Sequence, residues 1–322
     1  MGDVEDLVRQ ESRTVAGAAD LDVAVDVGRV EVHLEDAGTN DAGSEGNAPG
    51  ELEVRVEVRH DPAAAGGWAQ RLGEVASWLG SVGGPPDGGD GPVSAGPDAV
   101  RAAGISWSAP GAGGEAPTLT VRSTTELPLR MVPLVVTVWA PAGSRVTART
   151  GAGDVAVTGR AGRATVRTGA GTATTADVDG DAEVTTGSGD VVLGAVGGRA
   201  RIRTGSGTVR VGAVAGSTDI KAGNGDVAIG EVRADVGVRT GTGAVSVADA
   251  LAGRMDLTTG SGGLTIGVHA GVLAELDLSS GSGRARSELD VRQTAPAGEP
   301  VLWLRGRTAS GDVLVTRAAT PV

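Results

Sequence analysis

Three aspartates occupy the same place in a recurring phrase of this sequence, directly after a Gly-x-Gly turn: Asp154, Asp190 and Asp226. Clustered carboxylates carry out glycoside hydrolysis, in which one acid protonates the leaving oxygen and another activates water. If the chain stacks on itself with this period, successive members lie two rungs apart, about 9.6 Å, near the upper limit for an inverting pair. The competing interpretation is that each aspartate bonds to backbone near its turn. We favour the backbone role and expect no catalytic residue and no enzyme.

A second recurring set is basic and lies just before the turn phrase. Its members are Arg149, Arg167, Arg203, Lys221 and Arg239, with Thr185 interrupting. An exposed row of cations could bind a repeating polyanion such as a cell-wall polymer. The competing interpretation is a solvated face, because Glu183, Asp219 and Asp235 lie on the same segments and could pair with the cations.

Other site chemistry finds little support in the residue pattern. The three histidines, His33, His60 and His269, are scattered, and there is no cysteine, so we expect no metal site and no cofactor. A calcium β-roll needs an aspartate in nearly every turn, and here alternate turns lack it. An ice-binding array needs an outward threonine pattern, whereas these threonines share parity with the apolar residues. Trp68 and Trp78 form either a partner patch or an apolar face that covers the end of the fold.

The segment that must position these residues is a repeat. The second glycines of the phrase are separated by 18 residues five times, then by 19 and by 21, and they are Gly153, Gly171, Gly189, Gly207, Gly225, Gly243, Gly262 and Gly283. A fixed period over this many copies indicates units that pack only on their neighbours.

Each repeat has the residue pattern of β-strands. After Gly189, the residues Val191, Leu193, Val196, Ala200 and Ile202 alternate with polar or small residues. Alternation with period two predicts strands, and eighteen residues are too few for a βαβ unit. We therefore predict an all-β fold, a parallel β-helix or β-solenoid with coils of about 18 residues. Its Thr column, from Thr150 to Thr259, should lie at a corner and bond to turn backbone.

The repeated phrase T-G-[AS]-G-[DT]-V-x-[VL]-G resembles the bacterial putative-adhesin family of β-strand-repeat proteins, a β-solenoid domain of unknown function. The resemblance extends to the last phrase, 304–315, and to the lead-in at 135–144. It implies a β-solenoid and an adhesin-like role. It transfers no catalytic motif.

Composition agrees with a thin solenoid core. The chain has 322 residues, 55 of them glycine, with no phenylalanine or tyrosine, so its interior is built from small and branched aliphatic residues. The net charge of −12 is uneven: residues 1–140 carry 9 Arg and 22 acids, whereas residues 141–322 carry 19 basic and 18 acidic residues. We expect no nucleic-acid binding. Without a signal peptide or a membrane span, we expect a cytoplasmic location.

The chain divides into three predicted parts. Residues 1–19 form a polar tail, and residues 20–140 form a β-rich cap with a helical insert at about 62–103, where Asp98 could cap a short helix. Residues 141–318 form the solenoid. Strands are expected at 21–27, 30–34, 52–58, 105–107, 118–121 and 134–139.

These observations predict a non-enzymatic, adhesin-like scaffold or interaction protein, with an unidentified protein or an anionic polymer as its partner. The alternatives are a structural solenoid that forms homo-oligomers by end-to-end stacking, and a polysaccharide-active β-helix enzyme.

Overall fold

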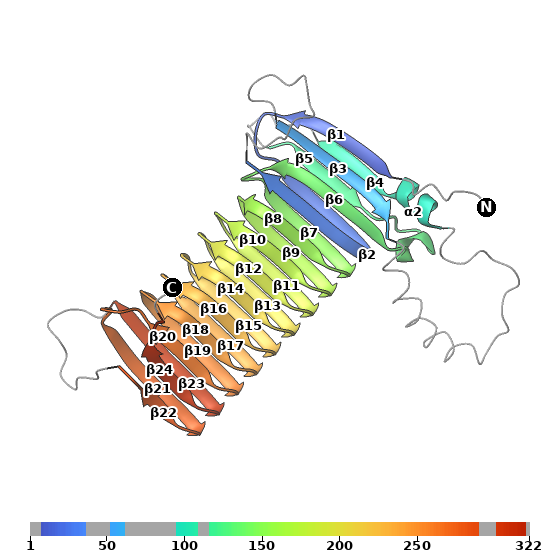
Figure 1. Cartoon of the computed structure of the whole chain (residues 1–322). Helices are drawn as coiled ribbons and strands as arrows, with labels where there is room; N and C mark the ends of the chain where they lie inside the picture. Colours follow the sequence, from blue (N-terminus) through green and yellow to red (C-terminus); the bar gives the residue numbers. More distant parts are fainter. Residues whose placement is uncertain (1–7, 37–51, 62–94, 109–115, 290–300, 320–322) are drawn as a thin grey trace, which may run out of the picture. The chain divides into compact units, whose positions relative to one another are not determined.

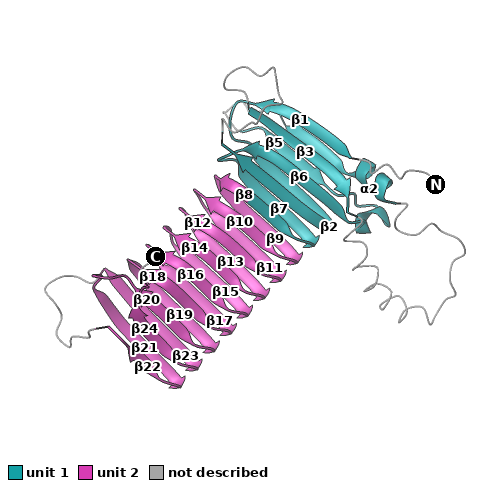
Figure 2. Cartoon of the chain, in the orientation of Figure 1, with its two compact units in different colours: residues 1–157 teal, residues 158–322 magenta. Residues whose placement is uncertain are grey.

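The computed structural model describes residues 8–36, 52–61, 95–108, 116–289 and 301–319. Its residues form β-strands, one short α-helix and one 3-10 turn. The chain divides into two compact units, Met1–Val157 and Thr158–Val322, coloured teal and magenta in Figure 2. Within the described ranges, no helix has the length and hydrophobicity needed to cross a bilayer.

The first unit mixes parallel and antiparallel strands. Its elements are β1 (Arg9–Val15), β2 (Asp20–Glu35), β3 (Leu52–His60), α2 (Gly96–Ala102), β4 (Gly104–Ser108), β5 (Thr118–Arg122), η1 (Leu129–Met131), β6 (Leu134–Pro141) and β7 (Arg145–Ala152); β8 (Val155–Ala161) crosses the division. Strand β2 serves two sheets because it passes through Gly28, whose φ of 126° only glycine adopts easily. Its first part pairs in parallel with β5 and β7, and its second part pairs in parallel with β6.

Two antiparallel pairings complete this unit. Strand β3 lies between β1 and β6 and is antiparallel to both, and β4 is antiparallel to β5. The six predicted strands are confirmed, and the two predicted on either side of Gly28 are one continuous strand.

Residues 9–15 correct the prediction of a polar tail over residues 1–19, since they form β1. Arg9, Glu11 and Arg13 gave no strand signal, and backbone pairing with Leu52–Val58 is what orders them. The short helix predicted near Asp98 is present as α2. Its N-cap is Ala95, however, and Asp98 instead pairs with Arg101 at 3.0 Å.

The second unit is a stack of two-strand coils. Its strands are β9 (Arg163–Ala170), β10 (Ala173–Val178), β11 (Ala182–Ser188), β12 (Val191–Val196), β13 (Ala200–Ser206), β14 (Val209–Val214), β15 (Thr218–Asn224), β16 (Val227–Val232), β17 (Val236–Thr242), β18 (Val245–Ala250), β19 (Gly253–Ser261), β20 (Leu264–Val268), β21 (Ala274–Ser282), β22 (Ala285–Ser287), β23 (Leu302–Ser310) and β24 (Val313–Arg317). Odd-numbered strands form one parallel sheet and even-numbered strands another, here called the odd sheet and the even sheet.

The register confirms the predicted parallel β-helix. From β9 to β17, each paired residue of the odd sheet lies opposite the residue 18 positions later, so Val184, Ile202, Ile220 and Val238 form one column, and all are 0% exposed. Outward residues form columns in the same way. Once one residue of a column is known to point inward or outward, the other residues of that column have the same orientation.

The corners between the two sheets depend on glycine. The second glycine of each phrase has a positive φ, for example 127° at Gly207, and its N–H donates to the next coil, here to the Asn224 carbonyl at 3.0 Å. The predicted hydroxyl column is buried at this corner, where Thr259 donates to the carbonyl of Gly243 at 3.0 Å. Because these threonines are buried, they cannot form an outward ice-binding array.

The last coil in the sequence is not the last coil in space. Strand β23 pairs with β19 on one side and β21 on the other, and β24 likewise lies between β20 and β22. Figure 1 shows this red pair of strands inside the stack. The coil of β21 and β22 therefore occupies the end of the second unit. The loop predicted before the final coil, at 295–300, lies outside the described residues.

The corner geometry predicts the effect of adding one methyl group. A Cβ on Gly207 would overlap the carbonyl oxygen of Gly189, and its φ is strained for alanine. We expect Gly207→Ala to lower the free energy of unfolding by at least about 1–3 kcal/mol, measured by chemical denaturation.

Gly237→Ala is the matched control in the same sheet. The nearest atom to its added Cβ is 3.8 Å away, so this variant should be neutral or slightly stabilising. Equal losses of stability in the two variants would contradict the close-approach argument.

Candidate functional site

The structure brings most of the predicted basic residues into one outward column of the odd sheet. Arg203 pairs in register with Lys221, and Lys221 with Arg239, while Thr185 separates Arg203 from Arg167. All four cations are exposed. Arg149 belongs to the first unit, on β7, where its guanidinium lies 3.3 Å from Asp22.

The coil of β23 and β24, here called the inserted coil, adds a cation that the sequence analysis missed. Thr258 follows Arg239 in the column, and the next member is Arg307 of β23. The basic column is therefore Arg167, Arg203, Lys221, Arg239 and Arg307. No acid interrupts it, because its remaining members are Thr185, Thr258 and Ser279.

Acids on the neighbouring columns neutralise only part of this set. Arg167 lies 3.1 Å from Glu183, Arg307 lies 3.6 Å from Asp277, and Lys221 has a long contact of 3.8 Å with Asp219. Among the described residues, neither Arg203 nor Arg239 has a carboxylate partner. The predicted diagonal pairing therefore exists at both ends of the column but is absent or weak at its centre.

Strand β13 and the residue before it carry a cluster of cations. Arg199, Arg201 and Arg203 all point outward, because they alternate with the buried Ala200 and Ile202. In the part of the chain that the structure describes, none of these three guanidinium groups has an ion pair or hydrogen bond. The three cations, here called the arginine cluster, stand about 6.8 Å apart along the strand.

A shallow depression lies beside the arginine cluster, over β9, β11 and β13. Its lining residues are Arg163, Ala164, Thr165, Asp181, Ala182, Glu183, Arg199 and Arg201. The Glu183 carboxylate pairs with Arg167. Arg163 is held by Asp181 at 2.9 Å, so the free positive charge of the depression comes from β13. The sequence signal for this site was the alternation of arginine over 199–203.

A row of small polar residues borders the column at the corner. Its members face solvent, pair in register and carry no charge: Ser188, Ser206, Asn224, Thr242, Ser261, Ser310 and Ser282. Hydroxyl and amide groups both donate and accept hydrogen bonds. The odd sheet therefore presents both cations and uncharged hydrogen-bonding groups.

The turn aspartates have a structural role instead. The Asp190 carboxylate accepts the backbone N–H of Thr208 in the next coil at 2.7 Å, and Asp226 accepts that of Ala244 at 2.8 Å. Asp312 accepts the N–H of Arg284, which lies earlier in the sequence but in the next coil in space. Asp190, Asp226 and Asp312 therefore each join two neighbouring coils.

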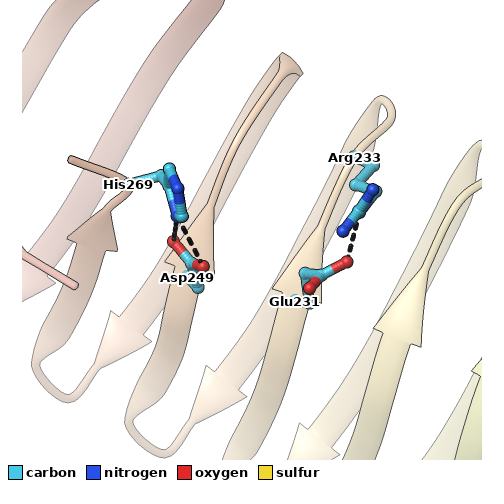
Figure 3. A network of polar contacts seen from close by, with 4 residues as sticks. All are labelled: Glu231, Arg233, Asp249 and His269. Carbon is cyan, nitrogen blue, oxygen red and sulfur yellow. Dashed lines mark hydrogen bonds and ion pairs between the residues drawn. The ribbon is translucent and has the colours of Figure 1, made fainter. Parts of the chain in front are cut away.

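A second polar network lies on the even-numbered strands (Figure 3). His269 lies 2.8 Å and 3.0 Å from the two Asp249 carboxylate oxygens, and Glu231 pairs with Arg233. The hydrogen bond from Arg233 lowers the pKa of Glu231, and the charge of His269 contributes in the same direction. Within the described ranges, no three His, Asp or Glu side chains lie together in a way that could hold a metal ion.

The predicted tryptophan patch stays a prediction. Trp68 and Trp78 both lie outside the described residues.

Comparisons with known proteins agree with the repeat. The family model described as Toastrack DUF4097 matches residues 134–317. A search of curated proteins gives no match.

Three solved bacterial structures align with most of the chain at low sequence identity. A putative adhesin from Bacteroides fragilis is 9% identical, with 95% of this chain and 97% of that chain covered and a TM-score of 0.36. A putative adhesin from Parabacteroides distasonis is 10% identical, with 97% and 98% covered and a TM-score of 0.29. A putative cell adhesion protein from Clostridium sporogenes is 7% identical, with 97% and 100% covered and a TM-score of 0.21.

The aspartate contacts predict a specific pattern of stability. Asp190→Ala should lower the free energy of unfolding by about 1–2 kcal/mol, because the Thr208 N–H loses its acceptor. Asp190→Asn keeps a side-chain oxygen and should recover much of that loss. Chemical denaturation of the two variants checks this, and equal losses would contradict the proposed contact.

The Glu231 contact predicts a pH effect. A carboxylate with a lowered pKa contributes stability above its unfolded-state pKa and loses it as the pH falls through the folded-state pKa. Arg233→Gln should therefore raise the pKa of Glu231 and reduce the loss of stability on acidification. Carboxyl NMR titration measures the pKa, and an unchanged Glu231 titration would contradict the assignment.

Proposed function

The chain belongs to the Toastrack DUF4097 family, and we propose that it is a non-enzymatic, adhesin-like scaffold that binds anionic polymers along the odd sheet. The observation that carries this proposal is the charge pattern of one outward face. Arg199, Arg201, Arg203 and Arg239 are exposed, and their guanidinium groups have no carboxylate partner among the described residues. Guanidinium groups that form no ion pair within the protein can bind an oxyanion directly.

The arrangement of these cations favours a repeating ligand. Along β13 the cations lie about 6.8 Å apart, and along the column successive rungs are about 4.8 Å apart. A guanidinium binds a phosphate, sulfate or carboxylate group through two parallel hydrogen bonds. A flexible polymer can therefore place several anionic groups on the arginine cluster and the basic column at once, and each added contact raises the total affinity.

The corner residues supply the second part of recognition. Ser206 and Asn224 stand beside Arg203 and Lys221 and offer uncharged donors and acceptors. Such groups suit the hydroxyls of a sugar or polyol chain. The preferred ligand class is therefore a hydroxyl-rich polymer with regularly spaced anionic groups, for which a teichoic acid is a suitable probe.

The polysaccharide-active enzyme is the competing function. It would use the turn aspartates as acid and base. Their engagement with backbone N–H groups of the next coil supports the scaffold instead.

The binding prediction concerns the centre of the basic column. Changing Arg203, Lys221 and Arg239 together to Ala should weaken binding to teichoic acid and heparin at least about tenfold at low salt. The slope of log affinity against log salt should fall by roughly two, because fewer counterions are released. Calorimetric or fluorescence titration at several salt concentrations measures both quantities.

The control variant removes the same charge elsewhere. Arg160, Arg210 and Arg233 are exposed and lie outside the odd sheet, so changing them to Ala alters the net charge equally. This control should bind nearly as well as the wild type. Absence of binding by the wild type at low salt would refute the proposal. Turnover of either polymer that is lost in Asp190→Asn and Asp226→Asn variants would refute the non-enzymatic assignment.

A further inference from the structure

The coil of β21 and β22 is incompletely packed. In the described chain, β21 pairs only with β23, and β22 pairs only with β24. Leu276 and Leu278 occupy interior positions yet are only half-buried, whereas their neighbour Leu304 is 2% exposed. Leu273 and Val301 beside them are 43% and 53% exposed. Both sheets of this unit therefore end in unpaired strand edges with an apolar layer between them.

An unpaired edge of this kind readily accepts another strand. From the edge and its charges, we propose that it binds a second copy of this chain, so that two β21–β22 coils pair antiparallel about a two-fold axis. The axis is perpendicular to the sheets, so β21 meets its mate and β22 meets its mate in one contact. Such an isologous contact closes on itself and gives a dimer.

The charges of the coil favour this partner. Glu275 lies at the start of β21, whereas Arg284 and Arg286 follow the turn at its end, and all three are exposed. Antiparallel pairing brings the acidic start of one coil towards the basic end of the other. Parallel pairing of identical coils would instead place Glu275 against Glu275, which is unfavourable.

A specific register satisfies these constraints. With the axis through Leu278, the two Leu278 side chains meet in the apolar layer and Asp277 lies opposite Ser279 of the mate. Glu275 then lies opposite Gly281, beside the turn that leads to Arg284. No two acids face each other directly, and the interior residues of both copies remain on the interior side, because antiparallel pairing about this axis preserves the faces.

The strands of the first unit do not offer a matching edge for open-ended stacking. In that unit, β1 and β4 each pair with a single described strand, and both are antiparallel to it. Strand β1 also carries Arg9, Glu11 and Arg13, and charged edge strands oppose pairing. The dimer uses only the second unit and needs no such edge.

The test is sedimentation velocity of the full chain without polymer over a range of concentrations. The wild type should approach twice its 31.6 kDa mass as concentration rises. Glu275→Arg or Arg284→Glu alone should raise the dimer dissociation constant about tenfold or more, since each places like charges together. The double variant Glu275→Arg with Arg284→Glu should restore dimerisation.

Asp256→Arg, a charge reversal on β19 inside the stack, is the control and should dimerise like the wild type. Thermal melting should show all variants folded, because the side chains of Glu275 and Arg284 have no ion pair within the described chain. A monomer at every concentration, a continuous series of larger oligomers, or a dimer insensitive to both single variants would each overturn the proposal. None of these results depends on polymer binding.

Discussion

Close approach of backbone to backbone at the glycine corner is the constraint on which the second unit depends. A second glycine such as Gly225 has a φ of 140°, and a Cβ there would overlap the carbonyl of Gly207 in the coil beneath. Because glycine has no side chain, each coil can turn directly above its neighbour, and strand pairing continues on both sides of the corner. The 18-residue coils keep this contact, and the 19-residue step from Gly243 to Gly262 keeps it as well, because the extra residue is accommodated away from the corner.

The stacked corners fix the register, and the register decides which residues form the core and which form the surface. With the register fixed, an inward position becomes a continuous apolar column and an outward position a continuous surface column. The basic column and the arginine cluster arise in this way. At the corners, turn carboxylates such as Asp190 accept backbone N–H groups and threonines such as Thr259 donate to backbone carbonyls, so these bonds do not require the outward cations. Surface charge in this fold can therefore vary with little effect on the core.

Periodicity explains why the fold and most strands could be predicted from the sequence. The alternation at Val191–Ile202 identifies strands, and the glycine spacing gives the coil length. The position of the last coil could not be predicted, since residues 302–317 carry the same phrase as every other coil and would fit any rung. Arg307 was missed for this reason. Strand β1 was missed because a charged edge strand has no apolar alternation, and only its partner β3 orders it.

The inserted coil also explains which coil is left at the end of the second unit. Strands β23 and β24 contribute Leu302, Leu304, Val313 and Val315, all fully or almost fully buried, and a coil this apolar is stable only with a neighbour on each side. In the coil of β21 and β22, Ala274, Ala285 and Ser287 stand where the inserted coil has Leu302, Val313 and Val315. Its smaller and more polar interior loses less when one side faces solvent. The order of coils in space therefore follows burial rather than sequence, and the edge belongs to the coil that tolerates it best.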